Sequence, residues 1–130
     1  MKLLPRDATD KQLIEEVHQW VRLLEVEKYD AAYSYTGHIE NSGWSPKFIK
    51  QLIEGYGEAE PGQKVTFNGK STDIHQRIEV SHWKENDCEE IGEVWYDLNI
   101  NGFASDITAT FRICVVPGGL VLKLNDVHVM

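Results

Sequence analysis

The sequence has few cysteines, no long apolar run and no excess of positive charge. Its two cysteines among 130 residues, Cys88 and Cys114, lack a metal-ligand spacing and are too few for a disulfide framework. This usage is typical of reduced thiols. No apolar stretch is long enough for a signal peptide or a membrane span. We therefore expect a cytoplasmic protein with no membrane partner.

The charge is strongly acidic. Thirteen Lys and Arg residues stand against 21 Asp and Glu residues, which gives a formal net charge of -8. Nucleic-acid binding needs clustered Lys and Arg, so nucleic acid is excluded as the main partner. An acidic surface attracts a basic protein partner, although the same charge also serves solubility alone.

The sequence contains no recognisable cofactor or metal motif. It lacks a glycine-rich phosphate loop, a nucleophile elbow and the spacing of a calcium loop. Its five histidines show none of the close pairing that is typical of zinc sites. We expect neither a metal nor a cofactor.

The first third of the chain has helical spacing. Thr9 and Gln12 fit a capping box, and the apolar stripe that follows continues to Leu24. A shorter helix is predicted over residues 28–35. Ser45-Pro46 supplies the N-cap and first residue of a third helix. Between these two helices we expect a loop or a very short strand.

From residue 65 onward, apolar residues alternate as they do in strands. A short strand is predicted at 65–67, and long strands at 74–83, 94–100, 103–116 and from 120 to the end. Tight turns at Asn101-Gly102 and Pro117-Gly118-Gly119 predict an antiparallel meander for the last three strands. One face of the 94–116 hairpin is apolar. The other is mostly polar and holds Glu93, Trp95, Asp97, Asp106, Thr108, Thr110 and Arg112.

The last strand ends in a polar pair, Asp126 and His128. If Gly118-Gly119 form the turn, Asp126 lies opposite Phe111 and His128 opposite Ala109, on the face toward the helices. A carboxylate beside an imidazole could fix its tautomer and make His128 a general base. The alternative is that both residues are solvated where the strand frays.

A ligand pocket on the same face is the companion hypothesis. Strand alternation places Tyr96, His82 and Gln76 on this face. Tyr33, on the second helix, could line the mouth of the cavity, although helical spacing also suits a core or rim residue.

Two surfaces could bind a protein partner. One is an acidic loop, which could dock a basic protein or simply be a solvated hairpin loop; it contains Glu85, Asp87, Glu89 and Glu90. The other is the outer sheet face, where Trp95 and Trp83 indicate a dimer or partner surface or else ordinary cross-strand packing. Trp44, in a glycine-containing loop, is either a partner anchor or a buried anchor of its loop.

The order of elements resembles the nuclear-transport-factor-2-like family, also called the cystatin-like cone. The resemblance covers nearly the whole chain and rests on residues 20–24, "KYDAAYSY", "SPKFIKQLIEGYG" and the strands from 74 to 129. It implies one α+β domain over residues 1–130, with N-terminal helices packed on the concave face of a curved antiparallel sheet. The resemblance also implies a conical cavity, which members use for catalysis, for binding or not at all, and dimerisation through the outer sheet face in many members.

Three functions remain open at this point. The first is a non-enzymatic binding domain, including an immunity-type protein that neutralises a partner protein, which some small bacterial family members resemble. The second is a small pocket enzyme, an isomerase, lyase or hydrolase using His128 and Asp126. The third is a structural homodimer without ligand. Negative charge, small size, the acidic loop and the lack of a catalytic signature favour the first.

Overall fold

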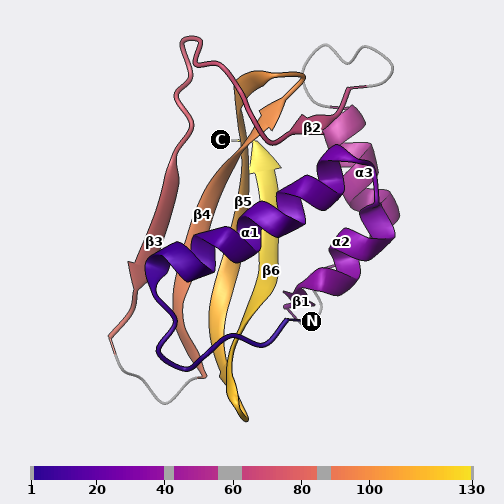
Figure 1. The fold of residues 1–130 in the computed structure, drawn as a ribbon. Helices are drawn as coiled ribbons and strands as arrows, with labels where there is room; N and C mark the ends of the chain where they lie inside the picture. Colours follow the sequence, from indigo (N-terminus) through magenta and orange to yellow (C-terminus); the bar gives the residue numbers. More distant parts are fainter. Residues whose placement is uncertain (1, 40–42, 56–62, 85–88, 130) are drawn as a thin grey trace.

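The computed structural model describes residues 2–39, 43–55, 63–84 and 89–129. Three helices come first, and a very short strand lies between the second and third (Figure 1). These elements are α1 (Asp10–Glu25), α2 (Tyr29–Tyr35), β1 (Gly37–His38) and α3 (Pro46–Glu54). Five strands follow: β2 (Val65–Thr66), β3 (Ile78–His82), β4 (Glu90–Ile100), β5 (Phe103–Val116) and β6 (Gly119–Val129).

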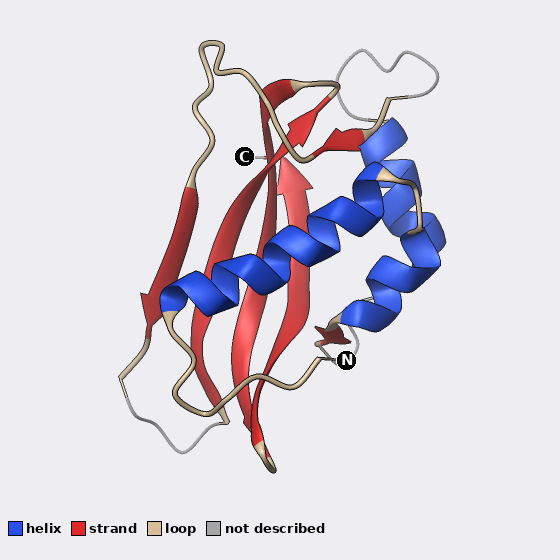
Figure 2. Cartoon of the chain, in the orientation of Figure 1, coloured by secondary structure: helices blue, strands red, loops and turns tan. Residues whose placement is uncertain are grey.

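The strands form one curled sheet with the helices on its concave side. Its order is β1-β6-β5-β4-β2, and β3 also pairs with β4. All of these pairings are antiparallel except β1 with β6, which is parallel. Helix α1 crosses the concave face diagonally, and α2 and α3 lie to one side of it (Figures 1 and 2). The predicted α+β architecture, with helices on the concave face of a curved sheet, is confirmed.

The helices begin where their capping residues predict. The Thr9 hydroxyl accepts a hydrogen bond from the Gln12 backbone N–H at 3.2 Å, and the Gln12 side chain accepts one from the Thr9 N–H at 2.8 Å. Ser45 caps α3 through the Phe48 N–H at 3.1 Å, and Pro46 is the first helical residue. Both caps satisfy backbone donors that a helix cannot satisfy internally.

The space between α1 and the sheet is filled by apolar side chains. Trp20 of α1 meets Phe111 of β5 edge to face, with ring centroids 5.0 Å apart, and neither side chain is exposed. Tyr96 and Leu124 on the same sheet face are exposed by 2% or less. A void of about 10 Å³ beside Glu16 has room for about one water molecule. This concave face is therefore a packed core where these residues lie.

The hairpin between β4 and β5 turns where the sequence predicts. Asn101 and Gly102 both have positive φ, 51° and 84°, as this turn type requires. Farther along, Val94 pairs with Phe111, not with the predicted Ala109, because the register shifts at a bulge near Asp97. A shift of two residues keeps every side chain on its predicted face, and Trp95 pairs with Thr110 on the outer face.

The turn into β6 is displaced by one residue from its predicted position. Pro117 and Gly118 occupy it, with Gly118 at φ 92°, and Val116 pairs with Gly119. Proline suits the first central position because its ring fixes φ near −65°, and glycine accepts the positive φ of the second. The prediction that Gly118-Gly119 form the turn was wrong for this reason.

A bulge at Asn125 then reverses the faces of β6. Leu124 pairs with Phe111, but the next paired residue of β6, Asp126, lies opposite Thr110. One extra residue in a strand turns every later side chain to the other face. The prediction that Asp126 and His128 face the helices was therefore wrong, and both lie on the outer face of the sheet.

The predicted first residues of the first two long strands also need correction. β3 begins at Ile78, four residues after the predicted start, because residues 74–77 run beside β4 with few ladder bonds. β4 begins at Glu90, earlier than the predicted Val94, and pairs there with Cys114.

Candidate functional site

The four residues predicted to share an inner pocket are distributed over three parts of the fold. Tyr96 is 2% exposed, and its burial raises its pKa to about 12, although a hydrogen bond with Gln76 acts in the opposite direction. The Gln76 amide also donates to the Asp97 carbonyl at 2.8 Å. Tyr33 stacks on His38 with ring centroids 3.8 Å apart, beside β1. Only Tyr96 and Gln76 are brought together.

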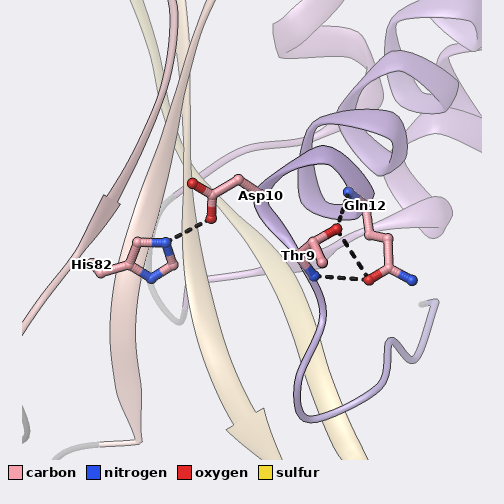
Figure 3. Close-up of polar contacts among 4 residues, drawn as sticks. All are labelled: Thr9, Asp10, Gln12 and His82. Carbon is pink, nitrogen blue, oxygen red and sulfur yellow. Dashed lines mark hydrogen bonds and ion pairs between the residues drawn. The ribbon is translucent and has the colours of Figure 1, made fainter.

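His82 lies at the end of β3 and contacts the first residue of α1. Its Nε2 is 2.6 Å from the Asp10 carboxylate, and Figure 3 shows this contact beside the Thr9–Gln12 capping box. Both side chains are more than half exposed. The pair therefore joins the sheet edge to the helix start at the surface and does not line an inner cavity.

Trp44 is an anchor of its own loop. Its indole N–H donates to the Asn125 carbonyl at 3.1 Å, and its ring packs against Phe48. The side chain is partly buried and lies against the core. Of the two hypotheses for Trp44, the structure supports the anchor of its own loop over the partner anchor, because the tryptophan holds the backbone of the β6 bulge.

The acidic loop is described only at its end. Glu85 and Asp87 lie outside the described residues. Glu89 is exposed, and Glu90 forms an ion pair with Arg112 at 2.9 Å. Arg112 in turn lies over the Trp83 ring, 4.9 Å from its centroid.

The predicted acid–base pair is formed, but on the outer face. His128 Nδ1 is 2.8 Å from the Asp126 carboxylate, and both side chains are partly exposed. On the opposite, concave side the neighbouring positions are closed by Ile107, Ala109 and Val127, which are exposed by 3% or less. The pair therefore does not line a cavity between sheet and helices.

Trp95 lies on the outer face of the sheet, paired with Thr110 of β5. Its ring centroid is 6.4 Å from that of His128, although β4 and β6 are separated by β5. Strands two apart lie about 9.5 Å from each other, so these side chains lean over β5. The residues of β5 beneath them, Thr108 and Thr110, are 0% and 3% exposed although they point away from the helices.

A cation extends this aromatic surface toward β3. The Arg77 guanidinium carbon lies 4.9 Å from the centre of the Trp95 ring, within the range of a cation–π contact. The Trp95 indole N–H donates to Glu93 at 2.6 Å on the same strand. We call Arg77, Trp95 and His128 the outer platform.

Three polar contacts hold the strands beneath the platform. Asp97 is 8% exposed and accepts hydrogen bonds from the Thr108 hydroxyl at 2.7 Å and the Arg77 backbone N–H at 2.9 Å. The Asn125 amide donates to the Thr110 hydroxyl at 3.3 Å. Side chains held in this way lose little conformational freedom on binding, which favours recognition.

Comparison with family models identifies one family, described as a domain of unknown function (DUF7668), whose model matches residues 21–130. The chain belongs to the DUF7668 family. No curated protein and no solved structure matches it. The match covers every element of the sheet, α2, α3 and the end of α1 from Val21 onward, so the outer platform lies within the DUF7668 domain.

In the described ranges, no group of three or more His, Cys, Asp or Glu side chains could hold a metal ion. Likewise, none of the helices described is long and apolar enough to cross a membrane.

Sequence reasoning found Trp95 but missed its partners. The sequence gives no signal for Arg77, because apolar alternation predicts regular strand for the segment before β3. The outward position of His128 had a visible signal: apolar residues change from even positions, Leu122 and Leu124, to odd positions, Val127 and Val129. Such a change of parity within one strand indicates a bulge.

Proposed function

We propose that this DUF7668 domain is a non-enzymatic binding domain that recognises a partner protein through the outer face of its sheet. The observation that carries the proposal is the outer platform, a tryptophan in contact with an arginine and a histidine on a face that no described helix covers. Tryptophan and arginine are enriched among residues that dominate binding energy. The polar residues of this face are compatible with a non-obligate interface, which need not be more apolar than the rest of the surface.

The same proposal includes an immunity-type role, a superfamily and a cellular location for the domain. An immunity-type role, in which the domain neutralises a partner protein, fits the net charge of -8 and a basic partner. Membership of the nuclear-transport-factor-2-like superfamily is compatible with helices on a curled sheet. A cytoplasmic location suits a free thiol at Cys114, whose burial raises its pKa and makes it unreactive.

The pocket-enzyme alternative has less support. It required Asp126 and His128 to line a cavity toward the helices, and they lie on the opposite face. The inner positions next to them are filled by Ile107, Ala109 and Val127. A second copy of the chain could also bind the platform and form a homodimer. The crosslinking experiment below distinguishes a homodimer from a complex with a partner protein.

The partner can be identified by photocrosslinking in cells that express the protein. A photoreactive phenylalanine analogue replaces Glu79, which pairs with Trp95 and is exposed. A matched control carries the same analogue at Lys11 on the exposed side of α1. We expect a crosslinked partner from position 79 and none from position 11. A crosslink to a second copy of the chain would replace the partner protein by a homodimer.

Calorimetry with the purified partner then tests the platform itself. We expect Trp95→Ala to weaken binding by at least about 30-fold, since a hot-spot residue contributes 2 kcal/mol or more. Lys11→Ala is the control and should bind like the wild type. Equal affinity of Trp95→Ala and wild type would refute the proposal, provided that circular dichroism shows the variant to be folded.

A further inference from the structure

A cleft opens at one end of the outer platform. It has a volume of about 290 Å³ and is formed by the segment before β3 together with β4 and β5. Its polar lining consists of His75, Arg77, Asp97, Ser105, Asp106 and Thr108. The cleft therefore shares Arg77 with the platform and continues the same surface.

The cleft forms where the β4–β5 ladder opens. Asn99 pairs with Ala104 and Asp97 with Thr108, so β5 has two more residues than β4 between these pairs. Ser105 closes part of the gap, because its hydroxyl donates to the Leu98 carbonyl at 2.6 Å and accepts from the Ile107 N–H at 3.3 Å. Bulges of this kind re-aim side chains and are frequent beside functional sites.

The lining of the cleft includes a carboxylate held in a fixed position. Asp97 is 8% exposed, and its two oxygens accept one hydrogen bond each, from Thr108 and from the Arg77 backbone. A carboxylate has about four acceptor positions. Asp97 therefore keeps acceptor capacity on both oxygens while its orientation is fixed.

The charges around the cleft favour a cation. Asp97 and Asp106 supply two carboxylates, whereas Arg77 is the one permanent cation of the lining, and its guanidinium lies over Trp95. The whole chain adds a net charge of -8, which attracts cations at long range. A volume of about 290 Å³ lies at the lower end of small-molecule pockets, which span about 300–1,000 Å³. One long side chain suits this space better than an entire small molecule.

We infer that the cleft receives a cationic side chain, arginine or lysine, of the partner protein, so that its charge meets Asp97 and Asp106 while the partner covers Trp95. This inference rests on the proposed function, because it names the chemistry of the partner at the same face. Arginine and lysine share this chemistry, and the probes below distinguish them.

The cleft can be tested without the partner, by nuclear magnetic resonance titration of the full chain. The probes are Nα-acetyl-arginine amide, Nα-acetyl-lysine amide and the neutral Nα-acetyl-norleucine amide. We expect saturable shifts of the Asp97 and Thr108 amide signals with at least one cationic probe and none with the neutral probe. Equal shifts with the neutral probe, or no saturable shift with either cation, would overturn the inference.

Variants show whether the carboxylates are responsible. Asp106→Asn should raise the dissociation constant of the cationic probe at least about threefold, and Asp97→Asn should raise it about tenfold. Glu79→Gln removes an exposed acid that does not line the cleft and should leave the dissociation constant unchanged. Because Asp97 also holds Thr108, Asp106→Asn provides the decisive result if Asp97→Asn does not fold. An Asp106→Asn variant that binds the probe like Glu79→Gln contradicts the inference.

Partner binding and probe binding, measured on the same variants, distinguish this inference from the proposed function. If Trp95→Ala abolishes partner binding while no cationic probe binds the cleft, the interface is correct and the cation site is wrong. If the probe binds in an Asp106-dependent manner while Trp95→Ala leaves partner binding intact, the cation site is correct and the platform is not the interface.

Discussion

Inserting one alanine between Asn125 and Asp126 should destabilise the protein strongly, because the number of residues at this bulge decides which face of β6 points into the core. With the extra residue, Asp126 would take the inward position that Val127 now occupies, opposite Ala109. Val127 is 3% exposed, so its loss from the core costs about 1.5–3 kcal/mol. Placing a carboxylate or imidazole there without a partner costs about 1–3 kcal/mol more. The expected loss in the free energy of unfolding is therefore about 2.5–6 kcal/mol.

Urea unfolding followed by tryptophan fluorescence measures this loss. The matched control is Asn125→Ala, which keeps the chain length and the bulge. It removes only the hydrogen bond from the Asn125 amide to Thr110, at 3.3 Å, and should cost about 0.5–1.5 kcal/mol. If the insertion were no more destabilising than Asn125→Ala, the number of residues at the bulge would not set the faces of β6, and the outward position of His128 would need another cause.

Three further outcomes follow from contacts elsewhere in the fold. Trp44→Phe keeps an aromatic ring, although a smaller one, and removes the hydrogen bond to the Asn125 carbonyl, so urea unfolding should show a loss of at least about 0.5–1.5 kcal/mol. An unchanged midpoint would mean that this bond does not stabilise the bulge. Thr9→Ala removes the α1 capping box and should cost about 1 kcal/mol, whereas Thr72→Ala, outside any helix, should cost less. Burial raises the pKa of Tyr96 to about 12, so its share of stability is complete below pH 10 and is lost between about pH 10 and 12. Stability of Tyr96→Phe should fall less over that interval, and an equal fall in both proteins would contradict the assigned cause.

The elements could be predicted wherever a local signal determines them. Thr9 with Gln12, Ser45 with Pro46, and Asn101 with Gly102 each carry their own chemistry, and the structure places a helix start or a turn at all three. The outer position of Trp95 followed from the Asn101-Gly102 turn, since counting from that turn assigns alternate residues to faces. Local signals of this kind do not depend on the rest of the fold.

The candidate site could not be predicted in the same way, because it depends on bulges. A bulge near Asp97 changes pairing by two residues and leaves the faces intact, whereas the bulge at Asn125 changes it by one and moves Asp126 and His128 to the other side. Counting from a turn carries no information about an inserted residue farther along. The contact between Arg77 and Trp95 also joins a segment outside the regular strands to β4, and no local pattern specifies it.

The partners of β6 have a consequence for how the chain folds during synthesis. Leu4 pairs with Leu120 by two backbone hydrogen bonds, and β1 pairs with residues 123–124 of β6. The beginning of the chain therefore completes its contacts only after more than a hundred further residues have left the ribosome. Contacts between residues so distant in sequence slow folding, and a nascent chain without β6 would leave the edge of β5 without its partner strand. We expect such chains to depend on chaperones until the last strand is released.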